Sequence, residues 1–105
     1  LLRAGKRALL LGDFNFPDGA PEAQALSDDF TDLWPSHHPG DPGFTIDSTL
    51  NPMGHRGPWV VQRRLDRILC HGDLKSHSME RLGTEPFKEH LFYSDHFGLL
   101  AHLSM

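Results

Sequence analysis

The sequence predicts an α/β domain, an α+β sandwich in which strands outnumber helices, and it supplies half of a larger fold of that kind. Strand-like apolar runs recur along the chain, only one or two short segments have helical character, and long polar loops join them. A complete parallel doubly wound fold would need more helices. We therefore expect residues 1–105 to form a single, partial domain.

Composition limits the classes of protein to consider. Apolar residues make up 38% of the 105 residues, and a chain of this size buries roughly 60–70% of its unfolded surface, so we expect a core. The net charge of −4 lacks the basic excess of proteins that bind nucleic acid by overall charge, so any contact with DNA must be local. No apolar stretch reaches the roughly 18 residues of a membrane-spanning helix. The sequence begins without Met, and we expect it to be a piece of a longer protein.

The first third of the chain contains one predicted strand and one predicted helix. Residues 7–11 end in an apolar run stopped by Gly12-Asp13, which indicates a buried strand leading into a loop. Residues 21–26 begin with Pro and predict a short helix. Residues 30–34 form a second apolar segment, which we expect Pro35 to close.

The rest of the chain reads as strands joined by loops. Pro, Gly, Asp and His dominate residues 37–43 and 51–58, which indicates two loops around a short apolar segment at 44–46. The lone cysteine, Cys70, ends an apolar run, and we expect it to be a buried, inert thiol, compatible with a reducing compartment. Three segments have strand patterns: residues 64–70, residues 74–82 and residues 97–103.

The motif Gly12-Asp13-Phe14-Asn15 follows the first predicted strand. In an extended chain the Asp13 carboxylate and the Asn15 amide project to the same side, so both could face one phosphate. The carboxylate could orient a water, and the amide could donate to a developing oxyanion. Asp-x-Asn is also common in turns and helix caps, so an ordinary turn is the alternative.

A second motif, Ser94-Asp95-His96, comes just before the last predicted strand. An imidazole beside a carboxylate can be held in one tautomer or kept protonated, and a cationic His suits contact with a scissile phosphate. The chain has eight His, so a surface or packing role is the alternative for His96.

Two further polar segments stand out. Asp66 lies inside an apolar strand, where an acid needs a partner, either His96 or a neighbouring Arg. An ordinary salt bridge from Asp66 to an Arg is as consistent with this pattern as a site. Residues 45–51 are polar enough to line a groove and equally suited to form a satisfied turn.

In this order, the motifs resemble the C-terminal half of the endonuclease/exonuclease/phosphatase family, which carries Gly-Asp-x-Asn, then an Arg-x-Asp-x-Ile strand, then Ser-Asp-His. The resemblance covers nearly the whole chain. It implies the C-terminal half of a four-layer α/β/β/α fold, and hence a partial catalytic domain. It also implies a metal-dependent phosphodiesterase using Mg²⁺, with Mn²⁺ as an alternative, in the nucleus or cytoplasm.

The resemblance assigns roles to individual residues. Asp13 would activate or position the attacking water, and Asn15 would stabilise the transition state. Asp66 would orient His96 on the phosphate, and Asp95 would lie at or next to the metal. The substrate-binding residues would be Thr45, Asp47, Asn51 and Ser94, and the choice of a phosphate contact among Arg56, Arg63 and Arg64 stays open.

Within the family, the likeness is to members that hydrolyse the 5′ link between DNA and a protein tyrosine during DNA repair. Those members have Thr in place of Phe14 and Trp in place of Ile46, and losing the Trp would weaken stacking on a base. A small phosphoester, such as an inositol phosphate or a phospholipid head group, is therefore an alternative substrate.

The third alternative is a non-catalytic assembly module. The family binds Mg²⁺ chiefly through an Asn and a Glu of its N-terminal half, which this chain lacks, so we expect the isolated chain to be inactive or very weak. The expected partner is the missing N-terminal half-domain, or a second copy of the chain through the exposed sheet.

Overall fold

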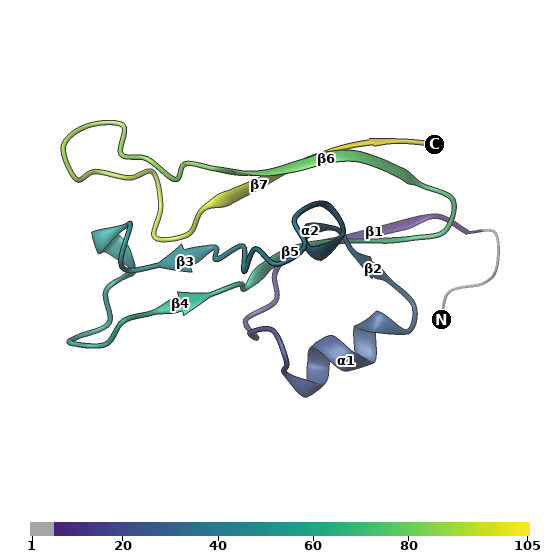
Figure 1. Ribbon diagram of the computed structural model, residues 1–105, viewed down its shortest axis with the longest axis horizontal. Helices are drawn as coiled ribbons and strands as arrows, with labels where there is room; N and C mark the ends of the chain where they lie inside the picture. Colours follow the sequence, from purple (N-terminus) through teal and green to yellow (C-terminus); the bar gives the residue numbers. More distant parts are fainter. Residues whose placement is uncertain (1–5) are drawn as a thin grey trace.

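The structure is a computed structural model that describes residues 6–105, and Figure 1 shows its arrangement. The strands are β1 (Ala8–Asp13), β2 (Thr31–Asp32), β3 (Ile46–Asp47), β4 (Gln62–Arg63), β5 (Asp66–His71), β6 (Lys75–Leu82) and β7 (Gly98–Ser104). The helices are α1 (Pro21–Ser27), α2 (Leu33–His37) and the 3₁₀ turn η1 (Pro52–Gly54). No helix among these described residues is long and apolar enough to cross a membrane.

The described strands form three antiparallel sheets. One has the order β1-β5-β2, and the other two are the β3–β4 and β6–β7 pairs. In Figure 1 the long β6–β7 hairpin runs along the three-stranded sheet, and α1 lies away from the hairpin. This mixed, strand-rich architecture confirms the α/β fold class.

The core lies between β5, α2 and the β6–β7 hairpin. Its buried members are Leu33, Trp34, Cys70 and Met79. Side chains alternate along a strand, so every second residue of β7 points inward, and Leu99, Ala101 and Leu103 pack on this cluster. The alternation predicted for residues 97–103 is confirmed, as is the burial of Cys70, which is 7% exposed. Burial raises the pKa of the Cys70 thiol.

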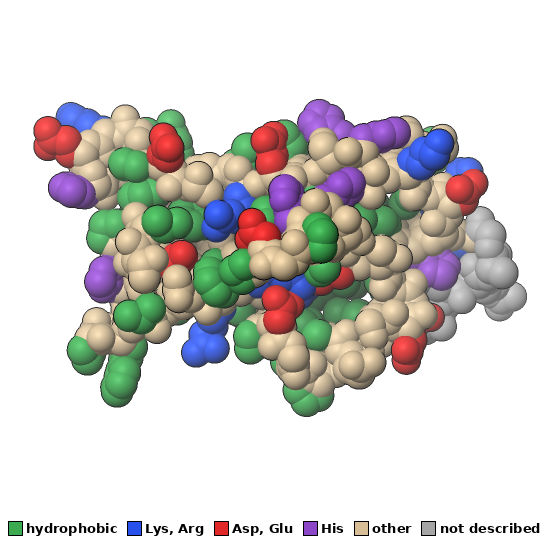
Figure 2. Space-filling view, viewed as in Figure 1, with side chains coloured by type: hydrophobic (Ala, Val, Ile, Leu, Met, Phe, Trp, Pro, Cys, Tyr) green, Lys and Arg blue, Asp and Glu red, His purple; other side chains and the backbone are tan. Residues whose placement is uncertain are grey.

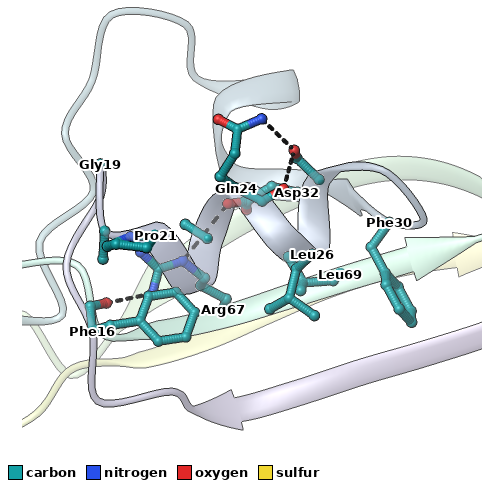
Figure 3. Close-up of a pocket in the computed structure, with 12 residues that line it drawn as sticks. Phe16, Gly19, Pro21, Gln24, Leu26, Phe30, Asp32, Arg67 and Leu69 are labelled. Carbon is teal, nitrogen blue, oxygen red and sulfur yellow. Dashed lines mark hydrogen bonds and ion pairs between the residues drawn. The ribbon is translucent and has the colours of Figure 1, made fainter.

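The two faces of β5 have different neighbours. Ile68 and Cys70 face the core cluster, whereas Arg67 and Leu69 line a cavity of about 350 Å³ between the sheet and α1. Figure 3 shows this cavity, with Leu26 and Phe30 on its apolar side and Arg67 near Phe16. Asp66, by alternation, lies on the same face as Ile68.

Two expectations about local structure were wrong. The strand at residues 7–11 forms as β1 but is not buried: Leu9 and Leu11 are 47% and 63% exposed. As an edge strand, β1 has a neighbouring strand on one side only, which leaves its side chains with fewer contacts. Pro35 does not close its segment but lies inside α2. As the third residue of this helix it needs no intrahelical N–H bond, so the first turn tolerates it.

Candidate active site

The register of β1 on β5 brings two carboxylates together. Asp13 is paired with Asp66 at the end of the ladder, and cross-strand partners project their side chains to the same face. His96 reaches the same place from the segment before β7. One ligand atom from each of Asp13, Asp66 and His96 lies within 4.8 Å of the others. The structure therefore brings together the carboxylates of Asp13 and Asp66 and the imidazole of His96, which belong to three separate predicted motifs.

His96 is held by a direct hydrogen bond to Asp66. Its Nδ1 lies 2.7 Å from Asp66 Oδ2, and because a carboxylate oxygen accepts hydrogen bonds, Nδ1 carries the proton that is donated. This contact leaves His96 Nε2 as the ring nitrogen that can meet a substrate. Of the two partners considered for Asp66, the structure supplies the histidine.

Thr45 links the strand of Asp66 to the segment of His96. Its hydroxyl oxygen accepts from the backbone N–H groups of Leu65 and Asp66 at 3.0 and 3.1 Å, and its carbonyl accepts from Phe97 N at 2.6 Å. Thr45 is 0% exposed and Phe97 is 2% exposed. Buried polar groups of this kind fix a backbone, since leaving them unpaired is costly.

Like Thr45, the Asn51 and Asp47 side chains are buried and hydrogen-bonded to nearby loop segments. Asn51 is 0% exposed; it donates from Nδ2 to the Ser94 carbonyl at 2.8 Å and accepts from Met53 N at 3.0 Å. Asp47 is 5% exposed and accepts from the N–H and hydroxyl of Thr49. Thr45, Asp47 and Asn51 are thus buried and hold the surrounding loops, and their contact with a substrate stays a prediction. Of the four predicted substrate contacts, only Ser94 is exposed.

The Asp13–Asn15 segment does not stay extended. Asn15 has a φ of 57°, in the left-handed region that Asn tolerates better than most residues. Its N–H donates to Asp13 Oδ1 at 2.8 Å, which is the local turn typical of Asp and Asn. The two side chains are therefore arranged by a turn and not by strand alternation, and both residues are exposed.

Asp95 pairs with an arginine beside the cluster. Arg56 Nη2 donates to Asp95 Oδ2 at 3.0 Å, with both side chains about half exposed. Partial desolvation opposes ionisation of Asp95, but the hydrogen bond from Arg56 and the charges of His96 and Arg56 outweigh it and hold the pKa of this carboxyl below its usual range. A place for Asp95 next to a metal stays a prediction.

The predicted arginine contacts separate into exposed and buried residues. Arg56 and Arg63 are exposed, whereas Arg64 is 5% exposed and is committed to the carboxylates of Asp18 and Asp32. Arg64 is therefore not available to a phosphate. In Figure 2, acidic and basic side chains are interspersed on the visible face.

Comparisons with known proteins agree with this arrangement. A model of the Endonuclease/Exonuclease/phosphatase family matches residues 1–96. No curated protein matches the chain. Similar solved structures include zebrafish (D. rerio) tyrosyl-DNA phosphodiesterase 2 (TDP2) complexed with single-strand DNA product (TM-score 0.76, 21% identity), TDP2 from Caenorhabditis elegans (0.71, 23%) and a family protein from Leptotrichia buccalis (0.63, 23%).

The comparison covers most of this chain but less than half of each relative. The matches cover 94%, 96% and 99% of the chain, and 42%, 30% and 37% of the zebrafish, nematode and bacterial chains. At these identities the likeness establishes the fold, while the family model spans most of the sequence. The chain therefore belongs to the endonuclease/exonuclease/phosphatase family, and its fold resembles part of the TDP2 fold.

Proposed function

We propose that the protein carrying this chain hydrolyses phosphodiesters with a divalent cation, and most concretely the 5′ link between DNA and a protein tyrosine. The observation that carries the proposal is the convergence of Asp13, Asp66 and His96, with one ligand atom of each within 4.8 Å of the others. Family membership supports hydrolysis of a phosphoester. The single-strand DNA product in the zebrafish structure supports a DNA strand as the substrate.

Four residues of this chain would have separate roles in the reaction. Asp66 keeps the proton on His96 Nδ1 and so presents Nε2 to a phosphate oxygen, where a protonated imidazole donates a hydrogen bond. Asp13 orients the attacking water and accepts its proton. The Asn15 side-chain amide donates to the oxygen on which charge develops in the transition state. Asp66 therefore acts on the substrate through His96, whereas the other three groups meet the substrate or the water.

The donor set fits part of the shell of a hard divalent cation. Mg²⁺ takes oxygen ligands in octahedral geometry, and Mn²⁺ accepts the same donors. Asp13 and Asp66 offer carboxylate oxygens on one face of the sheet, while Nδ1 of His96 is already engaged. Asp13 and Asp66 could each contribute an oxygen ligand, Asp95 stays the predicted residue at or next to the metal, and further ligands would come from outside the described residues. When bound, the cation would stabilise charge on the phosphate and activate water.

A small phosphoester is the second candidate substrate, and the position of Ile46 favours it. Ile46 is 4% exposed, so it cannot provide the stacking surface that an exposed aromatic gives to a base. An inositol phosphate or a phospholipid head group would not need that surface. A non-catalytic assembly module is the third candidate, since the chain spans only 42% of the zebrafish chain.

The exposed edge of β1 supports a protein partner. Leu9, Leu10 and Leu11 are between 38% and 63% exposed on a strand whose outer edge has no partner among the described residues. Such an edge favours pairing with another chain segment. The remaining part of the domain, as present in the longer solved relatives, is the occupant we propose, and a second copy of the chain is the alternative.

The test is Mg²⁺-dependent release of a 5′-tyrosyl group from single-stranded DNA, compared with hydrolysis of an inositol phosphate. Both substrates are offered to the 105-residue chain alone and to a form extended upstream by roughly a half-domain. Release from DNA by the extended form only, abolished by His96→Ala, would support the proposal. Turnover of only the inositol phosphate would favour the second candidate, and no turnover of either would leave the assembly module.

A further inference from the structure

A partly buried ion network connects the loop after β1 to the strand of Asp66, and the chemistry proposed above makes no use of it. Arg64 and Arg67 are 5% and 2% exposed, and both contact the carboxylates of Asp18 and Asp32. Among the described residues, no buried side-chain nitrogen or oxygen is left without a partner. Two buried cations are therefore matched by two carboxylates.

The contacts are directional. Arg64 donates from Nε to the Asp18 oxygens at 3.2 and 3.0 Å and from Nη1 to Asp32 Oδ1 at 2.9 Å. Arg67 donates from Nη1 to the Phe16 carbonyl at 2.8 Å and from Nη2 to Asp18 Oδ1 at 3.0 Å. Figure 3 shows the Arg67 side chain beside Phe16, with the hydrogen bond drawn, and the guanidinium lies 4.6 Å from the Phe16 ring centre.

The two arginines hold the Phe16 carbonyl and the Asp18 carboxylate. These groups lie close to the candidate site in sequence, but on the other face of the sheet. Phe16 directly follows Asn15, so the loop is tied down immediately after the Asp13–Asn15 turn. Arg67 directly follows Asp66, and neighbouring residues of a strand point to opposite faces. The loop therefore crosses the end of β5, from Asp13 on the face of Asp66 to Asp18 on the face of Arg67.

We propose that Asp18, Arg64 and Arg67 form a positioning clamp that holds Asp13 and Asn15 in place relative to Asp66. The inference rests on the proposed function and adds residues that touch neither substrate nor metal. A stabilising role alone explains the network poorly, because well-packed apolar side chains often replace a buried ion pair at no loss of stability. Guanidinium forks fix orientation as well as charge, and small displacements of reacting groups are costly, about 10²-fold in rate for 1 Å.

The first test is Asp18→Asn in the extended, active form of the protein. The Asp18 side chain is 55% exposed, so the substitution removes the negative charge without creating a new buried polar group. We expect kcat to fall about 10- to 100-fold, with KM changed about twofold or less, because the clamp sets geometry and not binding. Asp28→Asn is the matched control, an exposed aspartate just after α1, and should leave kcat unchanged.

The second test does not depend on turnover. Phe14 N–H donates to the Leu65 carbonyl at 2.8 Å and Asn15 N–H to Asp13 Oδ1 at 2.8 Å, so amide hydrogen exchange at these two residues reports on the loop. We expect Asp18→Asn to speed exchange there about tenfold or more, and to speed it less at Met79 in β6, where only the global loss of stability acts. Arg64→Lys, which keeps the charge but loses the fork, should have the same local effect.

The outcomes separate the clamp from the function on which it rests. Unchanged exchange at Phe14 and Asn15 would overturn the clamp, and so would a lower melting temperature with kcat per folded molecule unaltered. If the wild-type protein hydrolyses no phosphoester at all, the proposed function fails, and the exchange measurement still decides whether Asp18 holds the loop.

Discussion

His96 Nδ1 lies 2.7 Å from Asp66 Oδ2, although 30 positions separate the two residues in the sequence. One residue opens β5 and the other precedes β7, so the pair exists only when the hairpin packs along the sheet. Because the carboxylate fixes which ring nitrogen carries the proton, we expect the pair to behave as one unit in any proton transfer or phosphate contact.

Asp66→Asn should therefore impair turnover nearly as much as His96→Ala. The amide can no longer secure the tautomer, and we expect kcat to fall by about 10²–10⁴-fold in both variants. The double variant should lose little more, since residues that act as a unit are not additive. Steady-state kinetics on the preferred substrate checks this, with His102→Ala on the exposed side of β7 as control. Independent, multiplicative losses would contradict a functional pair.

Thr45→Val should destabilise the fold although the two side chains have the same shape. The change removes the acceptor of the Leu65 and Asp66 N–H groups at a residue that is 0% exposed. Each unsatisfied group costs about 1–3 kcal/mol, so the free energy of unfolding should fall by about 2 kcal/mol or more. Urea denaturation measures it. Thr45→Ser keeps the hydroxyl and should lose only about 1 kcal/mol; equal losses in the two variants would argue against the hydrogen bonds.

Cys70 should resist thiol reagents in the native protein. Burial excludes the reagent and raises the pKa of the thiol, which lowers the reactive thiolate fraction at pH 7. Labelling kinetics with a chromogenic disulfide should become fast only when urea unfolds the chain. In addition, Cys70→Ser should cost about 1–3 kcal/mol, because it places a hydroxyl in an apolar cluster, whereas Cys70→Ala should cost less. Rapid labelling without denaturant would show that the core around α2 opens locally.

Asp18 should contribute a pH-dependent term to stability. Desolvation opposes its ionisation, but the hydrogen bonds and charges of Arg64 and Arg67 hold its folded-state pKa below the ordinary 3.8. A depressed pKa stabilises the fold above the unfolded value, and that stabilisation is lost as pH falls through the folded value.

The corresponding experiment is urea unfolding of wild type and Asp18→Asn between neutral and acidic pH. The variant should be less stable at pH 7, by about 1 kcal/mol or less because the carboxylate is half exposed. The difference should shrink below about pH 4, as the wild-type carboxylate takes up a proton. A difference that stays constant into acid would mean that packing, and not charge, is responsible; Asp28→Asn should show no difference at any pH.

Local sequence patterns predicted the longer secondary-structure elements, whereas long-range packing decided which of their side chains are buried. Alternation in β7 and Pro at the start of α1 were sufficient because both signals lie within one element. The exposure of Leu11 could not be predicted, because an apolar run looks the same in an edge strand and in a buried one. The short strands β2 and β4, of two residues each, have no periodicity to detect.

The residues of the candidate site could be singled out from the sequence, but the contacts that hold them in place could not. Asp66 and His96 were identifiable because their residue types suit phosphate chemistry in a known order. The backbone hydrogen bonds of Thr45 and Asn51 were not predictable, since a polar loop residue gives the same sequence pattern whether or not it bonds to a neighbouring segment. No sequence pattern singled out Asp18, because its partner Arg64 lies 46 positions away in the chain.

The assembly of the cluster from three distant segments also has a kinetic consequence. Asp13, Asp66 and His96 can meet only after the β1–β5 ladder has paired and the β6–β7 hairpin has docked. Contacts of this kind require closure of long loops, which is slow compared with helix or hairpin formation. The imidazole signal of His96 in a time-resolved refolding experiment should accordingly be among the last to reach its native position, which makes this one side chain a reporter of completed folding.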